Sequence, residues 1–200
     1  MTETTSILAE ANPLDIVKGA DETDGEFVRI EYTAQPSLDV PHAETALPHA
    51  RWAADIPDEH VNPQVKESFQ VLSGELQVVA GDQVYLLTDG DKITISGKHP
   101  HRHWNPSDRP ARIRYEARPA IHMDEALETA FVLAQAGKAD EHGNPDLLPL
   151  AVFQNAYPDH FYSTDLPIIV QKLLFKVLAP IGRLAGYRPT YSRENIADLR

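Results

Sequence analysis

A run of short apolar or alternating segments between about Phe27 and Ala120 constrains the fold more than any other feature of the sequence. Pairs that favour tight turns between antiparallel strands interrupt this run at Ser73-Gly74, Gly81-Asp82 and Asp89-Gly90. The expected strands cover residues 27–33, 68–72, 76–79, 84–87, 92–95, 101–104 and 111–117. Short strands at such regular spacing predict a mainly β fold, an antiparallel sandwich or barrel.

The spacing of apolar residues becomes helical from Met123 onward, after a break near Pro119. The expected helices cover residues 124–135, 146–154 and 167 to about 178, with Gly137 suited to a helix end and Pro167 to a helix start. Residues 1–24 are polar and lack a strong period, which predicts a flexible or loosely docked arm. We therefore expect an arm (1–24), a β domain (25–120) and a helical extension (121–200) packed on that domain or on a dimer partner.

Composition and charge exclude several classes of protein. The chain of 200 residues has no Cys, so a metal would have to be held by His, Asp, Glu or Asn. Its net charge of −12 repels phosphate backbones and anionic lipid, and we expect no nucleic-acid partner. The N-terminus lacks a basic start followed by an apolar run, so we expect no signal peptide and a cytoplasmic location. Charged residues interrupt the apolar stretch 166–186, which therefore predicts no membrane span.

Two segments of the β region carry His, Asn and Glu side chains at distinctive spacings. In the first, gaps of one, four and six residues separate His60, Asn62, Glu67 and Gly74. The second places Gly90, Ser96, Lys98, His101 and Asn105 in order. Residues two apart on a strand share a face, so His60 and Asn62 point the same way, as do His101, His103 and Asn105.

Both spacings resemble the two motifs of the cupin superfamily, G-x5-H-x-H-x3-4-E-x6-G and G-x5-P-x-G-x2-H-x3-N. The resemblance covers roughly residues 27–118 and implies a cupin-type antiparallel β-barrel, or jelly roll, followed here by C-terminal helices. It also implies that the barrel holds a divalent metal ion through His60, Asn62, Glu67 and His101. We expect Fe(II) first, with Mn, Ni or Zn as alternatives.

The chain departs from the family pattern at four positions. Asn62 stands where the family usually has its second His, Ser96 where it has Pro, and Lys98 where it has Gly. The first motif also lacks its leading Gly, because position 54 is Ala. An amide oxygen is a harder and weaker ligand than imidazole, so zinc or copper should bind less tightly. The remaining two His and one Glu resemble the 2-His-1-carboxylate sites of non-haem Fe(II) oxygenases.

Each site residue also has a simpler interpretation. Glu67 could be a solvated strand carboxylate, and Asn62 could be a lining residue that makes hydrogen bonds. We expect His103 to line the barrel beside the ligands, although it could supply the missing imidazole. His42, His49 and His99 fall in expected surface loops.

We expect a metal-dependent enzyme that acts on a small organic substrate, with dioxygenase chemistry first and isomerase or cyclase chemistry next. His103 and Asn62 are the candidates for orienting the substrate. The alternative is a non-catalytic cupin that binds a small molecule or a metal as a sensor or binding module. A third class, an interaction protein, would use the helical tail as its working surface.

The last expected helix is apolar on more than one face. Its stripe Ile168, Ile169, Leu173, Phe175 and Leu178 is joined by Leu166, Val170, Leu174 and Val177. A helix packed on one barrel needs a single apolar stripe, so the surplus predicts a second partner. We expect a homodimer with this helix at or near the interface, and the helix could also cover one mouth of the barrel.

Overall fold

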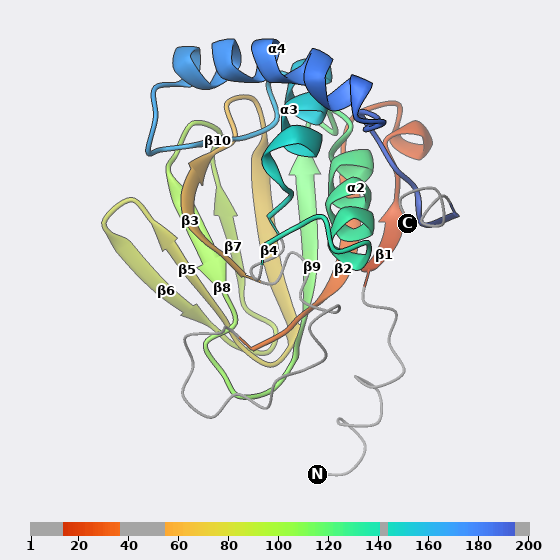
Figure 1. Cartoon of the computed structure of the whole chain (residues 1–200). Helices are drawn as coiled ribbons and strands as arrows, with labels where there is room; N and C mark the ends of the chain where they lie inside the picture. Colours follow the sequence, from red (N-terminus) through yellow and green to blue (C-terminus); the bar gives the residue numbers. More distant parts are fainter. Residues whose placement is uncertain (1–13, 37–54, 141–143, 195–200) are drawn as a thin grey trace.

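The computed structural model describes residues 14–36, 55–140 and 144–194. Within these ranges, ten strands form two five-stranded antiparallel sheets that face each other (Figure 1). The first sheet has the order β1 (Leu14–Lys18), β2 (Val28–Ala34), β9 (Ala111–Arg118), β4 (Lys66–Ser73) and β7 (Lys92–Ile95). The second has the order β10 (Tyr162–Ser163), β3 (Asp55–Val61), β8 (His101–Trp104), β5 (Leu76–Ala80) and β6 (Gln83–Leu87). This arrangement confirms the expected mainly β fold.

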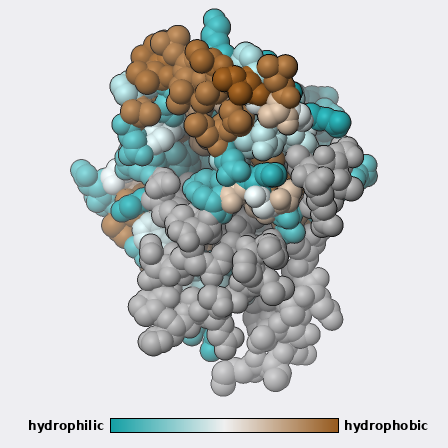
Figure 2. All heavy atoms as spheres, in the orientation of Figure 1, coloured by the Kyte–Doolittle hydropathy of each residue, from teal (hydrophilic) through white to brown (hydrophobic). Residues whose placement is uncertain are grey.

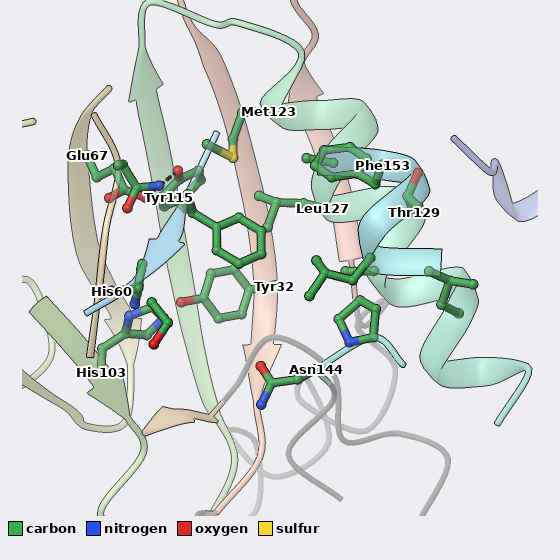
Figure 3. A pocket seen from close by; sticks show the side chains of 18 of the residues that line it. Tyr32, His60, Glu67, His103, Tyr115, Met123, Leu127, Thr129, Asn144 and Phe153 are labelled. Carbon is green, nitrogen blue, oxygen red and sulfur yellow. Dashed lines mark hydrogen bonds between the residues drawn. The ribbon is translucent and has the colours of Figure 1, made fainter. Parts of the chain in front are cut away.

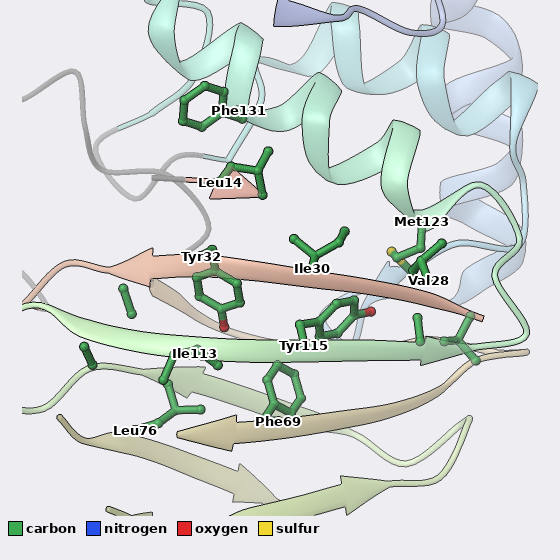
Figure 4. Close-up of a cluster of buried hydrophobic side chains, with 14 of the residues drawn as sticks. Leu14, Val28, Ile30, Tyr32, Phe69, Leu76, Ile113, Tyr115, Met123 and Phe131 are labelled. Carbon is green, nitrogen blue, oxygen red and sulfur yellow. The ribbon is translucent and has the colours of Figure 1, made fainter. Parts of the chain in front are cut away.

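Alternation along the strands separates the core from the solvent. In β9, Ile113 and Tyr115 point into the space between the sheets, where they lie near Phe69 and Leu76 (Figure 4). The intervening residues of β9 lie on the outer face, where Arg114 Nη2 is 2.8 Å from Glu31 Oε1 on β2. The period of two therefore buries one face of the sheet and gives the other cross-strand charge pairs.

Three α-helices follow the sheets: α2 (Met123–Gln135), α3 (Leu147–Ala156) and α4 (Ile168–Leu184). Helix α2 covers the part of the first sheet formed by β1 and β2, and Phe131 and Met123 join Leu14 and Ile30 in the core (Figure 4). Helix α3 packs on α4, which lies across the outside of the molecule (Figure 1). None of the helices in the described ranges is both long enough and apolar enough to cross a membrane.

Two expectations about the ends of the chain need correction. Residues 14–24 are not a flexible arm: β1 pairs with β2, Leu14 is fully buried, and a short 3-10 helix covers Asp21–Thr23. Residues 1–13 lie outside the described residues, as do His42 and His49. The last helix does not end near Leu178 but continues through Pro180 to Leu184.

The longer helix depends on close packing against α3. Gly182 of α4 is buried, and a Cβ atom at this position would lie 2.5 Å from Val152 Cγ2 and 2.9 Å from the carbonyl oxygen of Leu148. Tertiary packing of this kind stabilises a helix whose own sequence predicts an earlier end.

Candidate metal centre and cavity

The two sheets bring His60, Glu67 and His101 together. His60 on β3 pairs directly with His101 on β8, and their ring centroids are 4.3 Å apart. Glu67 comes from β4 on the facing sheet. One ligand atom from each residue lies within 4.8 Å of the other two, and all three side chains are buried. The three residues can therefore form a metal-binding group, as the spacing predicts.

The contact between His101 and Glu67 suits a cation. Nε2 of His101 lies 3.0 Å from Oε2 of Glu67, yet this nitrogen makes no hydrogen bond of acceptable geometry to any described group. The other ring nitrogen, Nδ1, is 3.0 Å from the carbonyl oxygen of His99 and can donate to it. A proton held on Nδ1 leaves the lone pair of Nε2 directed into the site, as in metal-binding histidines.

The electrostatics of the group favour an ionised carboxylate. Burial alone would raise the pKa of Glu67, but contacts with His101, His60 and the Tyr115 hydroxyl outweigh it, so the pKa is lowered. Burial alone would lower the pKa of His101, but the adjacent Glu67 carboxylate raises it. The pair thus attracts positive charge to the space between its two side chains.

A hydrogen bond orients the carboxylate. Tyr115 on β9 donates its hydroxyl to Oε1 of Glu67 over 2.7 Å (Figure 3). This leaves Oε2 as the oxygen nearer to His101. The alternation of residues 111–117 predicts that Tyr115 lies inside, but only the register of β9 against β4 shows that it meets Glu67.

Asn62 and His103 lie beside the group of three. Both side chains are buried, and Asn62 Oδ1 and His103 Nδ1 have no hydrogen-bond partner among the described residues. Burial, reinforced by His60 and His101, holds the pKa of His103 well below its ordinary value, so the ring is neutral. Its centroid lies 4.6 Å from that of Phe69 and 6.5 Å from that of His60.

The remaining motif residues have structural roles. Asn105 donates from Nδ2 to the carbonyl oxygens of Ala34 and Arg109, and thereby holds the turn after β8. Lys98 has a φ of 67°, the left-handed conformation that favours the glycine usual at this motif position. His99 is exposed, as expected for a surface loop.

The site opens into a cavity of about 380 Å³. Tyr32, Phe69 and Tyr115 line it from the first sheet, and His60 and His103 from the second (Figure 3). Across the cavity lie apolar side chains of the helices, including Met123 and Leu127 of α2 and Phe153 of α3. We expected the last helix to cover a mouth of the barrel, but helices α2 and α3 form this wall. Helix α4 contributes no lining residue among those described.

Comparisons with known proteins match the chain to one family model and to several solved structures. Residues 53–118 match the family model described as Cupin domain. Among solved structures, the chain is similar to a protein with a double-stranded β-helix domain from Klebsiella pneumoniae, with 17% identity, a TM-score of 0.39, and coverage of 60% of this chain and 90% of that one. It is also similar to TT1209 from Thermus thermophilus, with 20% identity, a TM-score of 0.41, and coverage of 60% and 97% respectively.

A third similar structure is a sugar phosphate isomerase of the cupin superfamily from Silicibacter pomeroyi, with 16% identity, a TM-score of 0.38, and coverage of 53% of this chain and 59% of that one. No curated protein matches the chain. The matched family model, the two facing antiparallel sheets and the motif residues gathered between them identify residues 53–118 as a cupin domain.

Proposed function

We propose that this cupin is a metal-dependent enzyme acting on a small, largely apolar organic substrate. The observation that supports the proposal most is the buried group of His60, Glu67 and His101, of which His60 and Glu67 line a mostly apolar cavity. Cavities of this size, with a few polar groups on one wall, are typical sites for small molecules.

The donor set fits a divalent metal ion. His60, Glu67 and His101 would hold it, and the unpartnered Oδ1 of Asn62 would serve as a fourth ligand. Two imidazoles, one carboxylate and one amide oxygen suit Fe(II) first, with Mn, Ni or Zn as alternatives. When bound, such an ion supplies Lewis-acid chemistry and, in the case of iron, electron-transfer chemistry.

The protein's own side chains have separate tasks in this proposal. Tyr115 holds the Glu67 carboxylate in place through its hydrogen bond. The neutral ring of His103 faces the cavity and can accept a hydrogen bond from a substrate hydroxyl or donate one to a substrate oxygen. Burial raises the pKa of Tyr32, so its hydroxyl stays protonated and able to donate.

The cavity wall favours particular substrates. Leu127, Leu133 and Phe153 of the helices face the polar groups across the cavity and would bind an apolar body while excluding water. Among the described residues that line the cavity there is no Lys or Arg, whereas Glu59 and Asp140 are present. This lining disfavours anionic substrates such as phosphate esters, so we propose a neutral substrate. Dioxygenase chemistry is the first candidate reaction, and isomerase or cyclase chemistry is the next.

Oxygen consumption tests the proposal. The protein, loaded with Fe(II), is supplied with small phenols, diketones and thiols while oxygen uptake is recorded. A dioxygenase consumes oxygen with at least one class, and Leu127→Trp, which fills the cavity from α2, suppresses the uptake while leaving the metal bound. Uptake that is unaffected by Leu127→Trp would place the reaction outside this cavity.

The second candidate is a non-catalytic cupin that binds a small molecule or metal. The amide of Asn62 at a position where the family usually has His favours it, because one imidazole fewer weakens the hold on many metals. Binding of a metal or of an apolar ligand, with neither oxygen uptake nor rearrangement of any compound tested, would support this candidate.

A further inference from the structure

Helix α4 exposes an apolar face along its whole length. The exposed fractions are 64% for Ile169, 59% for Leu173, 67% for Val177 and 90% for Leu184. Further exposed apolar side chains on or next to this helix are Leu166, Ile168, Val170, Leu174 and Ile181. They form the large hydrophobic surface on the outside of the molecule in Figure 2. A contiguous apolar surface of this kind marks an interaction site.

The exposed face is not a consequence of poor packing. The opposite side of α4 is well buried through Phe175, Ala179 and Gly182, which face the rest of the molecule. With 3.6 residues per turn, the two faces lie on opposite sides of the helix. The helix therefore packs on α3 through one face and presents the other as a ridge about 25 Å long.

The charges on α4 are all positive. Its 17 residues include Lys172, Lys176 and Arg183 and no Asp or Glu, in a chain whose net charge is −12. Spacings of four and seven residues place the three cations on one side of the helix, along an edge of the apolar face. Lys172 Nζ lies 3.3 Å from Asp159 Oδ1 at the protein side of that edge.

We propose that α4 is an interfacial helix that lies in the plane of an anionic lipid bilayer, with its apolar face among the acyl chains. Its apolar side chains would enter the hydrocarbon boundary, and the stems of Lys and Arg would let their charges reach the headgroups. The net charge predicts repulsion from anionic lipid, but charges more than about 8 Å away are largely screened at physiological salt. The local charge of α4 therefore decides the contact. This inference does not depend on the proposed enzymatic function.

A second copy of the chain fits this face less well. In a twofold-symmetric antiparallel pair of α4 helices, the edge carrying Lys172 and Lys176 would face the same edge of the partner helix. Asp159 offsets the charge of Lys172, but α4 itself has no acidic side chain to offset Lys176 when the two edges meet. A bilayer with anionic headgroups offers an apolar interior to the apolar face of α4 and negative charge to its cationic edge.

Vesicle sedimentation tests the proposal. The full chain at physiological ionic strength is mixed with vesicles of phosphatidylcholine alone, or of phosphatidylcholine with phosphatidylserine. We expect binding to the mixed vesicles, reduced at least about tenfold by Leu173→Ser with Val177→Ser. Lys176→Gln with Arg183→Gln should reduce it about fivefold for each cation removed.

The matched control changes equally exposed apolar residues on another face. Val84 and Leu86 on β6 are 64% and 58% exposed, so Val84→Ser with Leu86→Ser should leave vesicle binding unchanged. An equal loss of vesicle binding in the β6 variant and in the α4 variant would contradict the proposal. The absence of vesicle binding by the unmodified chain would also contradict it. A dimer that the α4 substitutions convert to monomer, in a protein that ignores vesicles, would assign the face to a second copy instead.

Discussion

Asn62 is the residue at which this site differs most from the usual cupin pattern. Its side chain is buried with Oδ1 unpartnered among the described residues, and it lines the same cavity as His60 and Glu67. Replacing this amide by imidazole in Asn62→His should raise the affinity for zinc or nickel about tenfold or more, because these metals prefer nitrogen ligands. Competition with a chelator measures the change. An unchanged affinity in a folded variant would mean that residue 62 does not face the metal.

The sequence predicts the individual ligands through the spacing of the two motifs. Of the three, only His101 falls within an expected strand, because β3, which carries His60, was not expected and β4 begins before Glu67. The sequence does not predict the residues that orient these ligands. The hydrogen bond from Tyr115 to Glu67 joins side chains 48 positions apart in the chain, and it depends on the register between β9 and β4. The same limit applies to Tyr32 and Phe161, which reach the cavity from outside both motifs.

At the scale of single elements, the contact between α3 and α4 depends on Gly182. A larger side chain there would press on Val152 and on the backbone of Leu148, the turn of α3 next to the cavity-lining Leu150. Gly182→Val should therefore destabilise the protein by about 1–3 kcal/mol, as is typical for overpacked contacts. Thermal unfolding measures this, with Leu184→Ala at a 90% exposed position as the control. Equal melting temperatures for the two variants would show that the helices do not pack this closely.

A buried imidazole lies where α3 runs into β10. His160 is 2% exposed, its Nε2 has no partner among the described residues, and its ring lies 5.1 Å from that of Phe153. Burial lowers its pKa. Since the folded pKa lies below the unfolded value of about 6.5, its contribution to stability is complete above that pH and is lost as the pH falls.

His160→Phe should therefore reduce the acid sensitivity of unfolding. A single group contributes at most about 1.4 kcal/mol per pH unit. Urea unfolding in the presence of a chelator, compared between neutral and mildly acidic pH, measures the slope. His103 also makes the protein less stable as the pH falls, because burial lowers its pKa as well. This effect is the same in the unmodified protein and in His160→Phe. A slope retained by His160→Phe would contradict the assignment.

At the scale of the whole molecule, the cavity unites parts of the chain that the sequence presents as separate regions. Its walls come from β2, from the cupin domain, from α2 and α3, and from the segment around Phe161. Periodicity predicts that the helices exist and which side of each is apolar. It cannot predict that α2 covers β1 and β2 while α4 stays outside, because that choice depends on contacts between distant segments.

The β1 strand illustrates the same limit at the other end of the chain. Leu14–Lys18 is too short to predict a strand by itself, yet β2 provides a pairing edge for it and Leu14 is buried in the core. The helical extension and the N-terminal strand therefore belong to one packed unit with the cupin domain, since Leu14 and Phe131 share its core.

The metal content of the purified protein tests the central claim most directly. Protein prepared without chelator and supplied with Fe(II), Mn, Ni or Zn is passed through a desalting column and analysed for bound metal. We expect about one divalent ion per chain in the unmodified protein and in the His99→Ala control, whose backbone carbonyl still accepts from His101. Glu67→Ala and His101→Ala should remove the ion while leaving the fold largely intact. Full occupancy in both folded variants, or no bound metal in the unmodified protein, would contradict the account.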